Sequence, residues 1–343
     1  MRRLLFIALL LGQLFSQSLF QRLAAPVFYE VGVEPNFQSN PLNLSEVEIN
    51  KAAEDSDYLN GIEYASSNVI SLTGELNYAP RLIGGRKSRF KLNLIHNYYH
   101  DIPQRSYQSY SISLRQSLGN YRYLDLGYWI LPEYYLRNYR LQDERTLETR
   151  REVCNFGTDR IWLGLEHRLS RKNSIEYNLV LRNEIYQAPF SHYDLRMMEG
   201  DVKLNLGQFE SFTFSTELQY GVAENDNNYD DKDRSYKYFN IRPTLTFKLP
   251  GKHRLRLATR YEQRGYDSEQ YDDLLHAGRY QDEIRVELTA LPHLSGPFVV
   301  EPFAGYRARR VDSSDAAVAD LKSFSRYWFG VRFGFKSVID MYF

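Results

Sequence analysis

The sequence predicts an all-β fold of about 14 strands, arranged as an up-and-down antiparallel sheet that closes on itself. Such closed sheets carry an even number of strands, so about 12 or about 16 strands are the alternatives. Two observations predict this fold. Apolar and polar residues alternate with a period of two along most of the chain, which indicates strands because successive side chains point to opposite faces. Short and long connections follow one another in turn along the chain. In an up-and-down sheet this order gathers the short connections at one end and the long ones at the other.

The alternating segments follow one another from position 27 to the last residue. In chain order they are 27–34, 62–80, 90–98, 109–118, 124–134, 161–169, 175–185, 202–206, 212–222, 240–249, 254–262, 283–288, 298–309 and 327–343. The short connections include 119–120, 170–173, 207–208, 250–251 and 295–296, and the long polar ones are 38–57, 142–152, 224–233, 267–278 and 312–320. Pro132 falls on the apolar side of its segment, which predicts a bulge or an edge there.

The last segment carries the clearest alternation. Its apolar row is Tyr327, Phe329, Val331, Phe333, Phe335, Ile339, Met341 and Phe343, interrupted by Ser337. This stretch resembles the closing strand of bacterial outer-membrane β-barrels, with Phe343, Met341, Ile339, Phe335 and Phe333 at the matching positions. The resemblance implies a transmembrane barrel in the outer membrane, with both chain ends on the periplasmic side, and a closing strand that the assembly machinery reads. The alternative is the edge strand of a soluble β-sandwich.

The N-terminus reads as a secretory signal. Arg2 and Arg3 precede the apolar run 4–11, and small residues follow near Ser16 and Ser18. This order of basic head, apolar core and small residues predicts a signal peptide over 1–18, with cleavage between 16 and 25. The remaining chain, 19–343, is expected to form a single barrel domain.

Composition narrows the function. Lys+Arg and Asp+Glu are both 43, so the net charge is zero, which argues against nucleic-acid binding. The mean hydropathy of −0.52 is compatible with a membrane barrel because lumen and loop residues dilute the lipid-facing ones. The single cysteine, Cys154, excludes an intramolecular disulfide and a multi-cysteine zinc site. The seven histidines are scattered and resemble no barrel phospholipase or protease motif, so neither catalysis, nor a cofactor, nor a metal site is expected.

The polar row of such a barrel faces its lumen. A closed sheet of this size has a backbone radius of roughly 14 Å, which leaves space for water between side chains. Arginines concentrate in the last third of this row, and glutamates lie in its middle. The candidate lumen charges are Arg254, Arg256, Arg260, Arg285, Arg307, Arg309, Arg326 and Arg332, with Glu166, Glu176, Glu184 and Glu217 expected to face them. Either these groups orient polar solutes, or they form an ion-pair network that only stiffens the wall.

The sequence therefore predicts a porin-like passive channel for small polar or charged solutes. The alternative is a non-conducting outer-membrane barrel that anchors or binds a partner through its outer loops. The expected partners are the lipid bilayer, lipopolysaccharide and the outer-membrane assembly machinery, with no nucleic acid. The acidic loops 224–233 and 267–273 could bind divalent cations, although a solvated loop is the simpler interpretation. The solute, the oligomeric state and whether the lumen is open or plugged are not readable from the residues.

Overall fold

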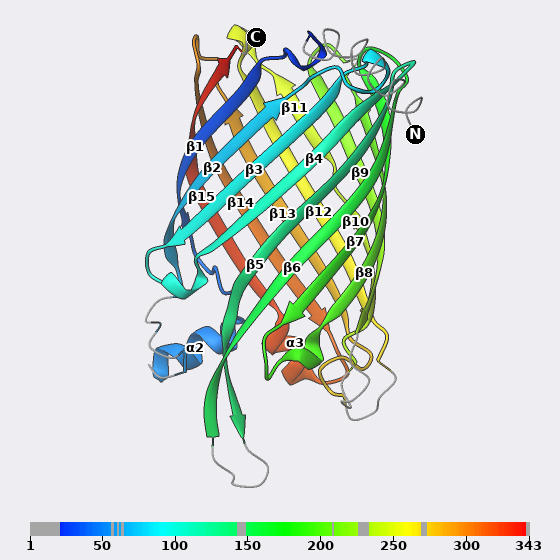
Figure 1. Ribbon diagram of the computed structural model, residues 1–343. Helices are drawn as coiled ribbons and strands as arrows, with labels where there is room; N and C mark the ends of the chain where they lie inside the picture. The colour runs from blue at the N-terminus through cyan, green and yellow to red at the C-terminus, as the bar shows by residue number, and fades with distance from the viewer. Residues whose placement is uncertain are drawn as a thin grey trace, which may run out of the picture.

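One antiparallel sheet closes into a barrel. The computed structural model of the protein describes residues 21–55, 58–59, 62, 65–142, 149–207, 209–225, 233–268 and 273–340. Each strand pairs with its neighbours in sequence, and the first strand, β1 (Val27–Gln38), pairs along its length with the last, β15 (Phe324–Ile339) (Figure 1). β10 (Tyr236–Ile241) and β11 (Thr244–Lys248) both lie between β9 and β12, so they are two halves of one wall strand interrupted at Pro243. The barrel therefore has 14 strand positions, which confirms the predicted fold.

The other wall strands follow in order around the barrel. They are β2 (Ser67–Tyr78), β3 (Ser88–Tyr99), β4 (Tyr107–Gly119), β5 (Arg122–Gln142), β6 (Thr149–Arg168), β7 (Asn173–Tyr186), β8 (Leu195–Leu206), β9 (Phe212–Asn225), β12 (Arg254–Tyr266), β13 (Tyr280–Leu291) and β14 (Phe298–Asp312). Each predicted segment corresponds to one wall position. Short turns gather at the end where β1 begins and β15 ends, and the longer connections gather at the other end (Figure 1).

The long connections contain more regular structure than the sequence predicted. The predicted loop 38–57 holds α2 (Glu46–Glu54), which Ser45 and Glu48 begin with a capping box. The predicted loop 312–320 overlaps α3 (Ala316–Lys322). The predicted loop 142–152 is shorter than expected, because β5 and β6 continue as a hairpin that projects beyond the other strands (Figure 1). Neither of these helices, nor any other helix among the described residues, is long and apolar enough to cross a membrane.

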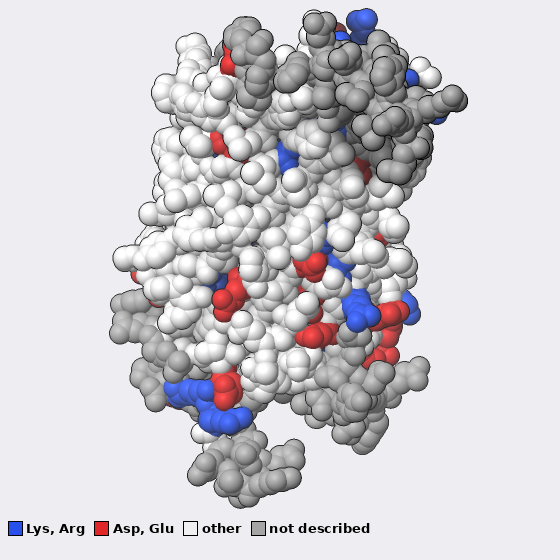
Figure 2. All heavy atoms as spheres, in the orientation of Figure 1, with Lys and Arg blue, Asp and Glu red and all other residues white. Residues whose placement is uncertain are grey.

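The outer face of the wall is apolar. Many of its large side chains are exposed, as at Leu163, Leu181 and Phe329, each at 49–54%. On the side shown in Figure 2, charged atoms gather mainly in the lower half, toward the long connections. Exposing so many large aliphatic and aromatic groups to water is unfavourable, whereas a bilayer solvates them. A closed sheet also leaves no free backbone edge to lipid.

The wall also has a bulge in β5. The register of β5 against β6 shifts between Leu131 and Tyr134, around Pro132. The bulge predicted at this proline is therefore present. Gly157 of β6 lies beside it, and a Cβ at that position would approach the Pro132 carbonyl oxygen to 2.7 Å. The absence of a side chain at Gly157 accommodates the bulge.

Two small apolar clusters close the long-connection end. The first packs the segment between β1 and β2 against the barrel, and it comprises Leu42, Leu44, Leu59, Ile62, Val69, Tyr99, Ile102 and Tyr135. Arg105, only 2% exposed, ties this segment down by donating to the backbone oxygens of Pro41, at 3.1 Å, and of Tyr135. Its guanidinium also lies 4.0 Å from the ring centroid of Tyr134. The second cluster, Cys154, Tyr186 and Phe190, supports the base of the projecting hairpin.

Candidate functional site

The structure places every predicted lumen charge in the inward-facing row. The arginines lie on β12, β13, β14 and β15, and the glutamates on β6, β7 and β9. Because β6 and β7 are about half a turn of the barrel from β14 and β15, the two groups do occupy facing parts of the wall. Within the described part of the chain, however, no ion pair joins the predicted arginines to the predicted glutamates. Most of these arginines and glutamates pair with other charged residues of the wall instead.

Most of these arginines pair with carboxylates on their own or adjacent strands. Glu283 of β13 accepts from both Arg307, at 2.7 and 2.8 Å, and Arg309, at 2.9 and 3.1 Å. Glu262 of β12 lies between Arg260 and Arg264 on the same strand. Residues two apart on a strand share a face, so this spacing alone could have identified Glu262 as a partner.

Three further predicted arginines also have carboxylate partners, and two do not. Arg332 bridges the seam of the barrel, reaching Glu34 of β1 at 2.7 Å and Glu301 of β14 at 2.9 Å. The other pairs are Arg285 with Glu287, at 3.1 Å, and Arg256 with Glu301, at 4.0 Å. Arg254 and Arg326 have no ion-pair partner among the residues that the structure describes.

The predicted glutamates are likewise engaged by near neighbours. Glu166 pairs with Arg115 of β4 and, at 3.2 Å, with Arg168. Glu184 pairs with Arg182 at 2.6 Å, and Glu217 with Arg242 at 2.7 Å. Glu176 accepts a hydrogen bond from Asn178 at 3.2 Å.

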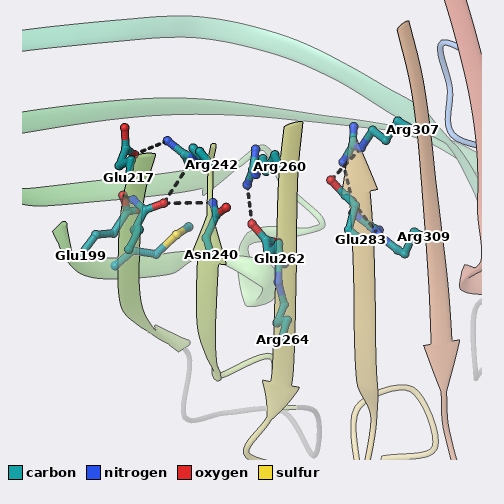
Figure 3. A network of polar contacts seen from close by, with 12 residues as sticks. Glu199, Glu217, Asn240, Arg242, Arg260, Glu262, Arg264, Glu283, Arg307 and Arg309 are labelled. Carbon is teal, nitrogen blue, oxygen red and sulfur yellow. Dashed lines mark hydrogen bonds and ion pairs between the residues drawn. The ribbon is translucent and has the colours of Figure 1, made fainter. Parts of the chain in front are cut away.

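A polar network crosses β8, β9 and β10. Arg242 donates to Glu217 and, at 2.8 Å, to Gln219, which also accepts from Asn240 at 3.1 Å (Figure 3). Gln219 in turn donates to Glu199 at 2.8 Å. The network lines a cavity of about 630 Å³ that extends across the inner wall from β6 to β12. A space of this size holds many waters, since each occupies about 30 Å³ in the liquid.

Carboxylates and guanidiniums differ in how far they reach into the lumen. The side chain of Glu262 is 3% exposed while that of its partner Arg260 is 34% exposed. Glu283 is 4% exposed against 20% for Arg307, and Glu166 is 7% exposed against 45% for Arg168. The longer arginine side chains project, while the carboxylates lie against the backbone wall. A solute in the lumen therefore meets mainly guanidinium groups, although the whole chain has no net charge.

Tryptophans also face the lumen, which the sequence analysis did not anticipate. Arg160 has its guanidinium carbon 5.5 Å from the ring of Trp129 and 5.4 Å from that of Trp162. The ring of Trp162 covers Gly127, and Trp328 covers Gly305 in the same way. In both cases the missing side chain of a cross-strand glycine makes room for an indole. A glycine directly opposite a tryptophan on the neighbouring strand is the sequence feature that indicates an inward-facing indole.

A buried histidine orders the connection between β12 and β13. His276 Nδ1 lies 2.9 Å from Asp273 Oδ2, and this oxygen also accepts from Ser268 Oγ at 3.2 Å and from the Asp233 amide at 3.0 Å. The serine contacts the carboxylate and not the imidazole, so the arrangement lacks a nucleophile–base contact and is structural. Burial lowers the pKa of His276 to about 4, and nearby Arg279 and Arg234 add to the shift against the opposing effect of Asp273.

This histidine makes the loop sensitive to acid. Its pKa is near 6.5 in an unfolded segment, so between about pH 4 and pH 6.5 the folded loop binds fewer protons. Loop stability should therefore rise with pH across this window and fall on acidification, by up to about 3 kcal/mol. We expect amide-exchange protection of residues 273–279 to drop from pH 7 to pH 4, and the drop to be absent in His276→Gln. Equal pH dependence in both proteins would contradict this assignment.

The closed sheet, the apolar outer face and the charged inner face together define the class of protein. They are the features of a transmembrane β-barrel of the bacterial outer membrane, and the chain has this porin-like fold. Residues 1–18, the predicted signal peptide, and the closing-strand residues Met341 and Phe343 lie outside the described residues.

The known proteins most similar to this chain are distant from it in sequence. No protein-family model and no curated protein sequence matches the chain. Among solved structures, an anion-selective porin from Comamonas acidovorans is 12% identical, with 91% of this chain and 99% of that chain covered and a TM-score of 0.44. A bacterial polysaccharide outer membrane secretin is 6% identical (92% and 99% covered, TM-score 0.45), and OprD of Pseudomonas aeruginosa is 9% identical (91% and 95% covered, TM-score 0.42). The function of this chain therefore has to be argued from its own residues.

Proposed function

We propose that the protein is a passive channel for small polar solutes and that it favours anions. The observation that carries the proposal is the unequal reach of the paired charges: guanidiniums project into the lumen while their carboxylates are recessed. In a lumen of reduced dielectric, the nearer charge dominates the potential that a permeating ion meets. The wall charges predicted from sequence, from Arg254 to Arg332, belong to this projecting set.

The test is ion selectivity in planar bilayers. Under a potassium chloride gradient, the reversal potential should indicate preference for chloride. Arg260→Gln and Arg242→Gln should each shift it toward potassium, because each change removes a projecting positive charge while its carboxylate partner, Glu262 or Glu217, stays in place. Asp282→Asn is the matched control, since Asp282 is exposed on the outer face and hydrogen-bonds Tyr261 at 2.8 Å. Cation preference in the unmodified protein would refute anion selectivity, and absence of conductance would refute the channel.

A non-conducting barrel is the second candidate, and one observation favours it. Leu321 and Lys322 of α3 meet Arg137 and Tyr139 of β5 around a cavity of about 220 Å³ at the long-connection end. β5 and β15, the strand that follows α3, are five strand positions apart around the barrel. The approach of α3 to β5 therefore spans the barrel opening at the long-connection end. Burial, with Arg137 nearby, lowers the pKa of Lys322 to about 8. A barrel closed by this bridge would bind partners through its outer segments; the conductance measurement separates the two functions.

Contacts with lipopolysaccharide and with the assembly machinery also remain proposals. The bilayer is implied by the apolar outer face. Recognition of the closing strand rests on the sequence resemblance at Ile339, Phe335 and Phe333.

A further inference from the structure

A second cavity lies at the short-turn end of the lumen. It has a volume of about 490 Å³ and is lined by, among others, Glu75, Lys87, Arg89, Lys91, Arg115 and Asp125. It belongs to the wall from β1 to β5, whereas the central cavity belongs to the wall from β6 to β12. None of the residues named here lines the central cavity. We call this space the β3 vestibule.

Three cations follow one another along one strand face of the β3 vestibule. Arg89 and Lys91 lie on the inward-facing row of β3, and Lys87, one residue before the strand begins, continues the alternation and lines the same cavity. Alternate residues on a strand are about 6.6 Å apart, which spaces the three positive groups along a line. Such a line suits an elongated anion that carries more than one charge.

Both carboxylates of the β3 vestibule are already engaged. Glu75 pairs with Lys91 at 2.7 Å, and Asp125 pairs with Arg115 at 3.3 Å. Among the described residues, no carboxylate lies within 4.0 Å of Lys87 or Arg89. The vestibule thus contains two exposed cations that have no ion-pair partner among the described residues.

The register adds an unfavourable contact. Arg89 of β3 is directly opposite Arg115 of β4. Like charges in directly opposed positions destabilise a sheet. Of these two arginines, only Arg115 forms ion pairs with the carboxylates of Asp125 and Glu166. A bound anion would relieve the repulsion and would provide Arg89 with a partner. Guanidiniums bind phosphoryl oxygens through paired hydrogen bonds, and lysine adds a point charge.

We propose that the β3 vestibule is a binding site for a small multivalent oxyanion of the phosphate or polyphosphate type. It lies on the inner side of the wall, so a free solute reaches it and a lipid headgroup does not. The inference rests on the proposed channel in that it gives permeating anions a docking position at the short-turn end. Binding itself does not depend on conduction.

The test is calorimetric titration of the folded, detergent-solubilised barrel with inorganic pyrophosphate. We expect saturable binding to the unmodified protein and at least tenfold weaker binding to the double variant Lys87→Gln, Arg89→Gln. The matched control is Arg171→Gln, Lys172→Gln, which removes two exposed cations from a turn at the same end of the barrel but outside the vestibule; its affinity should change less than twofold. Arg89→Lys, which keeps the charge, should give an intermediate affinity and serves if the double variant does not fold.

Absence of saturable binding to the unmodified protein would overturn the site, as would equal losses in the test and control variants. Bilayer recording separates this outcome from failure of the channel. Pyrophosphate added on the short-turn side should reduce conductance in the unmodified protein and not in the double variant. A protein that binds pyrophosphate without conducting would keep the site and reject the channel.

Discussion

Replacing Glu283 by glutamine is expected to lower the free energy of unfolding by about 2–3 kcal/mol. Glu283 is 3% exposed and neutralises both Arg307 and Arg309, so the change leaves two guanidiniums without an anionic partner. Removing one partner from a fully buried ion pair costs about 3–5 kcal/mol. The expected loss is smaller here because lumen water partly solvates the arginines. Urea unfolding in lipid vesicles, followed by tryptophan fluorescence, measures the effect.

Glu287→Gln is the matched control on the same strand. Glu287 faces the same lumen and pairs with Arg285 at 3.1 Å, but this pair is more exposed, at 22% and 44%. Exposed pairs contribute at most about 1 kcal/mol. Similar losses from both variants would show that burial of the carboxylate does not set the strength of these pairs, and the ranking of wall charges by depth would have to be abandoned.

Arg105→Ala is expected to release the segment between β1 and β2 from the barrel end. The change removes the donor for two buried carbonyl oxygens, those of Pro41 and Tyr135, and the contact with the ring of Tyr134. Each unsatisfied buried acceptor costs about 1–3 kcal/mol, so a local loss of about 3 kcal/mol is expected. Limited proteolysis should then cleave within 39–66 at least tenfold faster, because opening of the segment becomes more frequent.

Gln104→Ala provides the control for this substitution. Gln104 is the neighbouring residue and is exposed, so its truncation should leave cleavage unchanged. If Arg105→Ala and the unmodified protein are cleaved at equal rates, the apolar cluster around Leu44 and Ile102 holds the segment without help from the arginine.

The strands of the wall were predictable from the sequence because each face of a membrane barrel has a single kind of environment. Lipid outside and charged groups inside enforce a strict period of two, and the row from Tyr327 to Ile339 shows it clearly. The prediction failed where a face does not have a uniform environment. β8 begins at Leu195 and not at Val202, because Leu195 and Met197 point inward yet are apolar. At this level the inner face carries a buried apolar cluster with Ala223, Tyr236 and Tyr238, so the pattern no longer distinguishes inside from outside.

The partners of the lumen charges were not predictable in the same way. Which residues oppose each other depends on the stagger of neighbouring strands, and a shift of two residues preserves the pattern while changing every pair. Glu283 pairs with Arg309 because the register of β13 and β14 makes the two residues direct cross-strand neighbours. The composition of the chain does not reveal this register. By contrast, α2 had a readable signal in Ser45 and Glu48, whose spacing is that of a capping box.

The seam between β1 and β15 imposes an order on biogenesis. Val27 lies opposite Ile339, so the two partners of this pair are separated by most of the polypeptide. Until β1 and β15 pair, the sheet has two edge strands with unpaired backbone groups. Strands of other chains can pair with these edges, which leads to aggregation. Arg332 and Lys336 can reach Glu34 and Glu30 only when β1 and β15 pair. Closure of the barrel therefore depends on joining the two ends of the chain, and a polypeptide with open sheet edges has to be kept apart from its copies.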